Sequence, residues 1–132
     1  MENFTFSQLE YVRPDFEQLE KECRQMVEDI RNAKSFSDIK EVIERRDKIY
    51  SSLTTMATIA YIRNTLNTTD EFYEKEVEYN DEHLAVASVA MTEVSKALIS
   101  CKFTDEINAE YGPEFLVIEK REVDKFKEEL VP

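Results

Sequence analysis

Residues 36–66 read FSDIKEVIERRDKIYSSLTTMATIAYIRNTL, without a glycine or a proline. Apolar side chains recur along this stretch at steps of three and four, the spacing of one face of an α-helix. The first helix-breaking cluster is Asn67-Thr68-Thr69, so the stretch predicts a single helix of about 30 residues. Its first half is rich in charged residues, whereas residues 51–61 carry none. We therefore expect the second half of this helix to be the more deeply buried.

The scarcity of helix breakers extends this prediction to the whole chain. Glycine and proline occur only at Pro14, Gly112, Pro113 and Pro132. Residues 15–111 therefore contain neither, although sheet proteins need such turn residues far more often. The sequence predicts an all-α fold, an antiparallel bundle of about three long helices with one or two shorter helices at its C-terminal end.

Other segments carry helical patterns of their own. We expect the first helix to run from about Pro14 to Ala33, with apolar residues at every third or fourth position. Thr68 and Glu71 form a capping-box pattern, which predicts the start of a third helix that runs to Cys101. A short helix over 104–111 and a final amphipathic helix from Pro113 follow. Before the second helix, Ser35 and Asp38 form a variant of the capping box.

The two ends of the chain differ from its helical middle. Residues 1–13, which include Phe4 and Phe6, are predicted to be an extended lead-in to a single domain over residues 1–132. At the other end, Leu130-Val131-Pro132 follows the last helix without a capping signal or a polar tail. We interpret this abrupt end as that of a domain cut from a longer protein.

Charge and composition disfavour several classes of partner. The chain has 17 Lys and Arg against 29 Asp and Glu, a net charge of −12, which repels nucleic acids and anionic membranes. The N-terminus lacks a signal-peptide pattern, and the most apolar segment, 84–91, is too short to span a bilayer. Cys23 and Cys101 are isolated, as in proteins of a reducing compartment, and we expect them to be core or boundary residues. We expect a cytoplasmic protein.

The sequence offers no recognisable catalytic or metal-binding set. Its one histidine, His83, cannot form a zinc site of the H-E-x-x-H type or a carboxylate di-iron site, and we expect it on a helix surface. Neither cysteine has a histidine or a basic cluster close to it in sequence. The acidic residues alternate with Lys and Arg at helical spacings, which is typical of solvated helix faces. We predict no catalytic residue, metal ligand or cofactor within this chain.

The densest group of hydrogen-bonding side chains lies at the junction of the second and third predicted helices. It comprises Tyr61, Arg63, Asn64, Asn67, Asp70 and Tyr73, which we call the corner residues. Polar groups at this density beside an apolar helix either complete a buried network or face a partner. The sequence leaves both possibilities open.

The same stretch carries a family resemblance. Ile62-Arg63-Asn64-Thr65, with residues 67–73 and Glu76, resembles the N-terminal region of the oligoendopeptidase F family of thimet-oligopeptidase-like zinc metallopeptidases. Other pieces agree in order, namely Tyr11, Arg13-Pro14-Asp15, Asn32-Ala33-Lys34-Ser35, Lys102-Phe103 and Glu110-Tyr111-Gly112. The resemblance covers essentially the whole chain.

The resemblance implies an N-terminal helical domain of a longer enzyme that hydrolyses short peptides inside a deep channel. Family members hold zinc with an H-E-x-x-H motif and a more distant Glu. This sequence contains no such motif, so no catalytic or metal residue carries over, and zinc is implied only for the full-length family member. The domain would form part of the channel wall. The corner residues would contact the missing catalytic half or the peptide substrate.

Two expectations about partners follow. An isolated domain would leave bare the face that meets the catalytic half, and large exposed apolar patches tend to associate, so we expect a symmetric homodimer. The alternative to a peptidase domain is a stand-alone acidic helical module that binds a peptide or protein in a groove between the second and third helices. Neither interpretation includes a nucleic acid or a membrane as partner.

Overall fold

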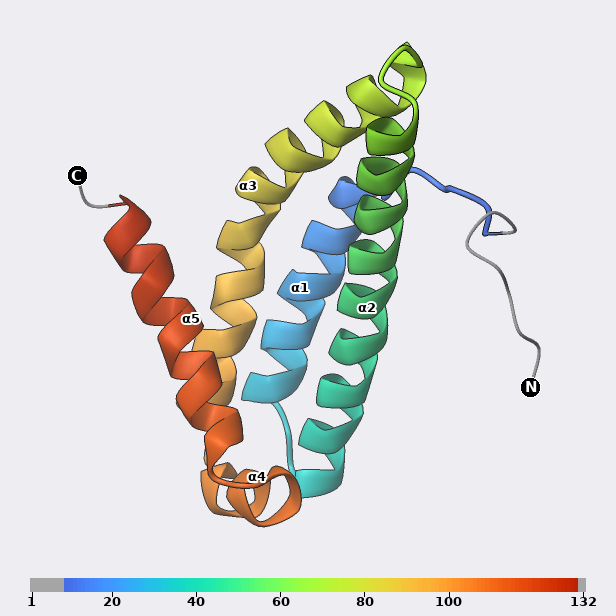
Figure 1. Cartoon of the computed structure of the whole chain (residues 1–132). Coiled ribbons are helices and arrows are strands. Elements are labelled where there is room, and N and C mark those ends of the chain that lie inside the picture. Colours follow the sequence, from blue (N-terminus) through green and yellow to red (C-terminus); the bar gives the residue numbers. More distant parts are fainter. Residues whose placement is uncertain (1–8, 131–132) are drawn as a thin grey trace.

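The computed structural model describes residues 9–130 and shows an all-α bundle (Figure 1). The helices are α1 (Phe16–Arg31), α2 (Phe36–Leu66), α3 (Glu71–Ile99), α4 (Thr104–Tyr111) and α5 (Glu114–Leu130). No strand occurs in this part of the chain. The predicted fold class is therefore confirmed, with α1, α2 and α3 as the long helices and α4 and α5 as the C-terminal ones.

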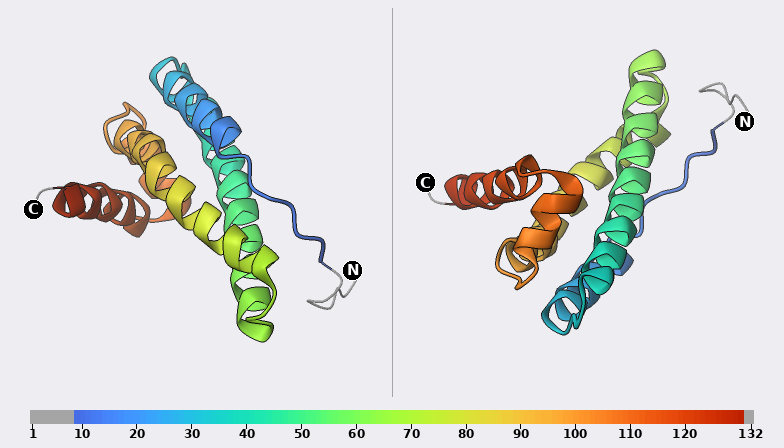
Figure 2. Two further views of the ribbon diagram at one scale, coloured as in Figure 1. Left: turned by 90° about the horizontal axis from the view of Figure 1, so that it is seen from above. Right: turned by 90° about the horizontal axis from the view of Figure 1, so that it is seen from below.

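Helix α3 organises the bundle. It packs against α1, α2 and α5, while α4 packs against α5. Helices α2 and α3 form a long antiparallel hairpin, and α1 lies along one part of it (Figure 1). Helix α5 starts beside the C-terminal end of α3 and leans away from it toward its own C-terminal end, as the views along the bundle also show (Figure 2).

The hydrophobic core lies where α1, the first half of α2 and the second half of α3 meet. Its fully buried side chains come from all three helices and from α4, and include Cys23, Met26, Ile39, Ile43, Val94, Leu98 and Ile107. Helix α1 shows the cleanest pattern, because Phe16, Leu19, Cys23, Met26, Val27 and Ile30 are all buried, as its periodicity predicts. Burial of this apolar face holds α1 in place.

The expectation that the second half of α2 is more deeply buried was wrong. The first half buries Ile39, Val42, Ile43 and Arg46, whereas most of residues 51–58 are exposed. Helix α1 has 16 residues against 31 in α2, so it covers only part of the longer helix. The absence of charge in residues 51–61 reflects serines and threonines that face solvent. Uncharged polar residues do not mark a buried face.

The caps differ from the predicted ones at all three long helices. Asp15 caps α1 by accepting a hydrogen bond from the Gln18 amide, so that helix begins after Pro14 and not at it. Before α2, Ser35 makes no side-chain cap bond, and Asp38 accepts instead from the Lys34 amide at 3.0 Å.

The predicted Thr68/Glu71 capping box is also wrong. Asp70 is the cap of α3 and accepts a 2.9 Å hydrogen bond from the Phe72 amide. An aspartate placed directly before the first helical residue is at least as good a cap as a threonine, and it starts the helix later than predicted. At its other end, α3 stops at Ile99, before Cys101.

Two of the segments outside the helices have the conformations that the sequence predicts. Residues 9–13 are not helical, as predicted; Phe4 and Phe6, and the residues Val131 and Pro132, lie outside the described part. Gly112 ends α4 with φ at +90°, a conformation that favours glycine.

Within residues 9–130 no single helix is long and apolar enough to cross a membrane. Only α3 and α4 taken together meet the criteria of length and composition, and they are bent by 99°.

Candidate interaction site

The corner residues lie at the far end of the α2–α3 hairpin, and two of them are directly bonded. Arg63 Nη1 donates to the Tyr73 hydroxyl at 3.0 Å, and the guanidinium lies 5.7 Å from the centre of the Tyr73 ring. Arg63 also donates to the carbonyl oxygen of Leu9. This arginine therefore joins α2, α3 and the extended N-terminal segment.

The other corner residues divide between structural and exposed positions. Asn67 accepts hydrogen bonds from the amide and hydroxyl of Thr69, and Asp70 caps α3. Asn64 is half-buried, whereas Tyr61 is 63% exposed and turned away from the core. The structure thus brings Arg63 and Tyr73 together and uses Asn67 and Asp70 to shape the turn.

Two exposed apolar side chains beside the corner were missed by the sequence reasoning. Leu66 is 75% exposed and Phe72 is 57% exposed, and both flank the turn that holds Asn67 and Asp70. Tyr61 lies five residues before Leu66 on α2, and we call these three exposed side chains, Tyr61, Leu66 and Phe72, the apolar tip of the hairpin. The Phe72 ring packs edge-on against Tyr11 and Tyr73, yet more than half of this side chain stays exposed, which helical periodicity alone does not predict.

Residues 9–13 are tied to the hairpin by a compact polar cluster. Glu76 on α3 accepts hydrogen bonds from the Tyr11 hydroxyl at 3.0 Å and from Arg13 Nε at 2.9 Å, while Arg13 Nη2 completes a two-point ion pair. Asn80, also buried on α3, donates to the Tyr11 hydroxyl at 3.3 Å. The Arg13 guanidinium holds the pKa of the Glu76 carboxyl below its usual range. Glu76 is therefore a buried anion that fixes the N-terminal segment.

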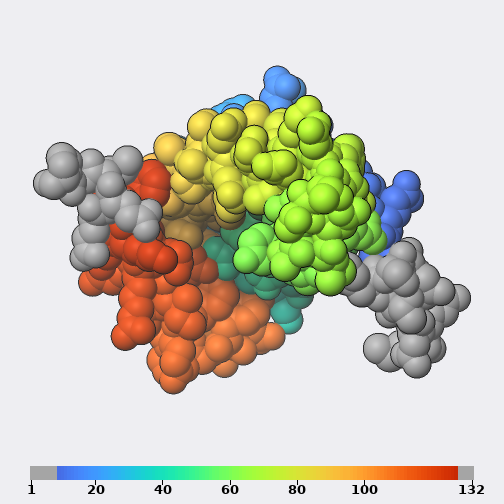
Figure 3. Space-filling view, turned by 45° about the horizontal axis from the view of Figure 1, so that its top comes forward, coloured from blue at the N-terminus to red at the C-terminus, as the bar shows by residue number. Residues whose placement is uncertain are grey.

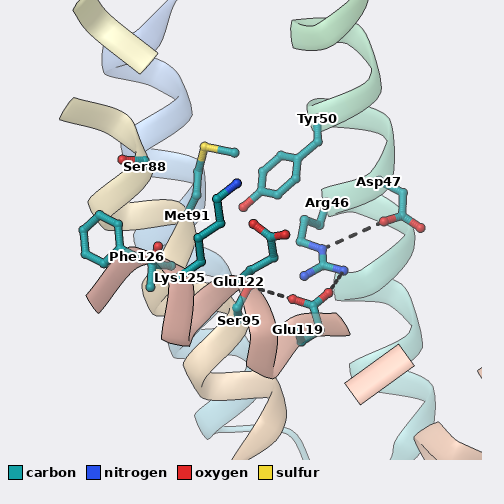
Figure 4. A pocket seen from close by; sticks show the side chains of 11 residues that line it. Arg46, Asp47, Tyr50, Ser88, Met91, Ser95, Glu119, Glu122, Lys125 and Phe126 are labelled. Carbon is teal, nitrogen blue, oxygen red and sulfur yellow. Dashed lines mark hydrogen bonds and ion pairs between the residues drawn. The ribbon is translucent and has the colours of Figure 1, made fainter. Parts of the chain in front are cut away.

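A second polar cluster joins α5 to the bundle. Arg46 Nη2 on α2 lies 2.5 Å from a Glu119 carboxylate oxygen on α5, and the Ser95 hydroxyl on α3 donates to the other oxygen at 2.6 Å. All three side chains are buried. They form the floor of a cavity of about 390 Å³ between α2, α3 and α5, which the space-filling view shows as a recess beside α5 (Figures 3 and 4).

Aromatic side chains and Cys23 surround the Arg46 end of this cluster. The Arg46 guanidinium lies 5.7 Å from the ring centres of both Tyr50 and Phe115. Burial raises the pKa of the Tyr50 hydroxyl, so Tyr50 stays neutral. The Tyr50 hydroxyl lies 3.8 Å from the sulfur of Cys23, and burial likewise raises the pKa of that thiol. Cys23 is thus a core residue and Cys101 a boundary residue, as predicted.

A second cavity, of about 810 Å³, lies between residues 12–22 and α2 and is more apolar than the cavity beside α5. Its walls include Val12, Ile49, Leu53 and Met56. The exposed part of α2 described above forms one side of it. The Val12 amide lies 3.3 Å from the Met56 sulfur, which marks where the N-terminal segment crosses α2.

His83 and the acidic residues form no metal centre in the described part of the chain. The His83 ring is tilted over Tyr79 with 4.0 Å between ring centres, and it also contacts Phe16. The expectation of an ordinary surface position is therefore only half right, since the ring is half-buried against α1. No group of three or more His, Cys, Asp or Glu within residues 9–127 is arranged to hold a metal ion.

Comparison with known families identifies this arrangement of helices. The sequence model described as the peptidase M3 N-terminal domain matches residues 6–126. The chain belongs to this family. The match includes the corner residues, the Glu76 cluster and most of α5. A search among curated proteins gave no significant match.

Solved structures of the family's enzymes contain the same fold. The chain is similar to a Bacillus anthracis protein assigned as an oligoendopeptidase F, with 31% identity and a TM-score of 0.86 over 93% of this chain. It is similar to a further protein assigned as an oligoendopeptidase F, with 29% identity and a TM-score of 0.86 over 92% of this chain. PZ peptidase A, solved with an inhibitor, gives 27% identity and a TM-score of 0.85 over 90%.

The matched region is a small part of those proteins. The chain spans 21% of PZ peptidase A and of one oligoendopeptidase F, and 23% of the Bacillus anthracis protein. The predicted resemblance to the oligoendopeptidase F family is confirmed over nearly the whole chain, and it concerns the N-terminal domain of these peptidases.

Proposed function

We propose that this chain serves as the non-catalytic N-terminal domain of a cytoplasmic zinc metallopeptidase that hydrolyses short peptides. The observation that carries the proposal is the agreement in fold with three peptidases, at 27–31% identity, over at least 90% of this chain. In this role the domain positions a wall of the enzyme, and the chemistry is carried out by residues outside it.

The described residues do not fit a zinc ion, and we derive no step through one. A catalytic zinc site needs three protein ligands of the His, Asp, Glu or Cys type within coordination distance, and residues 9–127 hold no such group. The buried carboxylates Glu76 and Glu119 are each neutralised by an arginine. In the proposed enzyme, the zinc ligands therefore belong to the remaining part of the protein.

We assign the corner residues to the contact with that remaining part or with peptide substrate. Tyr61, Leu66 and Phe72 leave an apolar tip uncovered, and exposed apolar patches commonly mark interaction sites. The Arg63–Tyr73 bond and the Asp70 cap hold this tip in a defined shape. A pre-ordered surface loses little conformational entropy when it binds.

The first experiment compares the intact mass of the natural protein with the reading frame that encodes this chain. A frame that continues past Pro132 and encodes an H-E-x-x-H motif supports the proposal. A stop codon directly after Pro132 contradicts it and favours a stand-alone interaction module. The second experiment measures cleavage of an internally quenched peptide by the full-length product, before and after removal of metal by 1,10-phenanthroline.

Variants of the full-length product test the role of the tip. We expect Tyr61→Ala and Leu66→Ala to change KM or kcat by about fivefold, the effect of losing roughly 1 kcal/mol of apolar contact. Val117→Ala and Ile118→Ala on α5 are matched controls, because both residues are more than half exposed but distant in the fold. If the tip variants and the control variants change KM or kcat equally, the tip is not part of the proposed contact.

A further inference from the structure

The N-terminal segment, residues 9–13, contacts α2 through a methionine sulfur. The Val12 amide donates to Met56 Sδ with 3.3 Å between nitrogen and sulfur, and this contact is exposed to solvent. A thioether is a weak hydrogen-bond acceptor, and most backbone amides pair with an oxygen atom instead. The attachment of the segment at this point therefore depends on the chemical state of one accessible sulfur.

The methionines of the described residues differ in accessibility. Met26 is fully buried in the core, and Met91 is half-buried beneath α5 in the cavity beside that helix. Met56 is also half-buried, but it lies between two openings. The second cavity is on one side of it, and a surface hollow that it shares with Ser51, Ser52 and Thr55 is on the other. A small oxidant can therefore approach the Met56 sulfur from solvent.

An oxygen atom on this sulfur does not fit the present geometry. A hydroperoxide transfers one oxygen to a thioether, which becomes a sulfoxide, and is itself reduced to an alcohol or to water. If that oxygen pointed at the Val12 amide, a hydrogen bond would need about 2.9 Å between nitrogen and oxygen, but the nitrogen now lies only 3.3 Å from the sulfur.

The other orientations of the oxygen also break the contact. Turned toward Ile49 and Leu53, the oxygen would bring a polar group against the apolar wall of the second cavity. Turned toward solvent, it would leave the Val12 amide facing a sulfur with partial positive charge, which accepts poorly. In every orientation either Val12 or the Met56 side chain must move.

A movement of Val12 acts directly on the Glu76 cluster. Val12 lies between Tyr11 and Arg13, and these two side chains supply the hydrogen bonds that the Glu76 carboxylate accepts among the described residues. The Glu76 side chain is only 3% exposed, so each lost hydrogen bond leaves a costly buried acceptor. The Arg13 guanidinium also lies 4.0 Å from the centre of the Tyr79 ring. Three consecutive residues thus couple Met56 on α2 to α3.

We propose that Met56 is an oxidation site that releases the N-terminal segment from the α2–α3 hairpin. In the thioether form, Val12 is bonded to α2 while Tyr11 and Arg13 hold α3. In the sulfoxide form, the Val12 contact is lost and the segment opens more often. The oxidant is a hydroperoxide, and methionine sulfoxide reductases reverse the change. The inference is independent of the proposed function, because it assigns a modification site and involves no catalytic step.

The test treats the full chain with hydrogen peroxide and then measures chymotrypsin cleavage between Tyr11 and Val12 by mass spectrometry. Dithiothreitol after the peroxide reverses sulfenic acids and disulfides at cysteine. We expect Met56 to be oxidised before Met26, and cleavage after Tyr11 to become about fivefold faster, the effect of losing one hydrogen bond. Cleavage reports local opening.

Two variants and one control assign the effect to this sulfur. Met56→Leu keeps the apolar shape without the sulfur, and its cleavage rate does not respond to peroxide. Met56→Gln places a polar group at the same position and is cleaved about fivefold faster than the wild type without peroxide. Met91→Leu removes the other half-buried methionine and is the matched control, which keeps the full response to peroxide.

Three results would overturn the inference: Met56 still a thioether when Met26 is oxidised, unchanged cleavage after Tyr11 once Met56 is oxidised, or equal peroxide responses in Met56→Leu and Met91→Leu. Amide exchange of the core residues Ile43 and Leu98 should stay unchanged; faster exchange there would also contradict the inference, because the whole fold would then be opening. Sulfoxide reductases acting on the oxidised chain should restore the original cleavage rate, and a rate that stays high after reduction counts against the proposal.

Discussion

The Arg46 guanidinium of α2 lies 2.5 Å from the Glu119 carboxylate of α5, with side chains 7% and 10% exposed. No other ion pair in the described residues links α5 to α2. Because Ser95 of α3 donates to the same carboxylate, one acidic group ties together three helices. Buried pairs of this kind cost free energy to desolvate, but removing one partner costs more, since it strands the other charge.

We predict that Glu119→Gln lowers the free energy of unfolding by about 3 kcal/mol, because it leaves the buried Arg46 with only a 3.9 Å contact to the exposed Asp47 as counter-charge. Urea unfolding followed by circular dichroism measures the change. Glu122→Gln, one turn further along α5 and exposed, is the matched control and changes stability by less than about 0.5 kcal/mol. The double variant Arg46→Met/Glu119→Leu recovers most of the loss. Equal stability of Glu119→Gln and the wild type would refute this account of the pair.

The Glu76 cluster predicts a pH dependence of stability. Since its folded pKa is lowered by Arg13, Glu76 stabilises the fold above the unfolded pKa, near 4.5, and this contribution disappears as the pH falls through the folded pKa. We expect the stability difference between the wild type and Glu76→Gln to be constant near neutral pH and to shrink below about pH 4.5. Thermal unfolding of both proteins at several pH values checks this. A difference that stays constant down to pH 2 would contradict it.

The start of α3 offers a test of helix capping. Asp70→Ala removes the acceptor for the Phe72 amide, and we expect a loss of about 1 kcal/mol. Thr68→Ala, at the position that the sequence suggested as the cap, should change stability by less than about 0.3 kcal/mol. Chemical unfolding of the two variants distinguishes the two positions. A larger loss of stability in Thr68→Ala than in Asp70→Ala would show that Thr68, and not Asp70, caps α3.

The two cysteines should react with thiol reagents at very different rates. Cys23 is fully buried and the pKa of its thiol is raised by burial, whereas Cys101 is partly exposed. Because the thiolate is the reactive form, we expect one equivalent of iodoacetamide to label Cys101 first, and Cys23 only in denaturant. Peptide mass spectrometry locates the label. Equal labelling of both residues in the native protein would show that the core opens readily.

The apolar tip of the hairpin predicts self-association of the isolated chain. Leu66 is 75% exposed and Phe72 is 57% exposed, and a second copy can cover both. We expect light scattering to show a dimer at high protein concentration and a monomer for Leu66→Glu/Phe72→Glu. Val117→Glu/Ile118→Glu on α5 keeps the same added charge and serves as the control. A monomer at every concentration would contradict the expected homodimer.

Much of the fold could be predicted from the sequence because its signals are local. The run without glycine or proline and the apolar period of α1 are both properties of short windows, and each led to a helix that the structure contains. The caps were predicted less well. Thr68 and Asp70 both satisfy the residue preferences of a cap, and only the packing of the chain decides which is used.

The burial of α2 shows what local pattern does not contain. The serines and threonines of residues 51–58 carry no charge, and we took this as a sign of burial. Which part of a long helix is buried depends instead on the length of the helices that pack against it. The same limit applies to the candidate site. The corner residues could be picked out as a dense polar group, whereas the pairing of Arg46 with Glu119 joins helices far apart in the chain and left no sequence signal.

The unequal lengths of α1 and α2 give the hairpin a mechanical property. At 1.5 Å per residue, α2 is about 46 Å long and α1 about 24 Å, so roughly 20 Å of the hairpin projects beyond the three-helix core. A bend of about 5° at the edge of the core would displace the tip by about 2 Å, within the gentle curvature that long helices adopt. The Glu76 cluster is placed to brace this arm. A small bend of this arm therefore moves the apolar tip while the core stays unchanged.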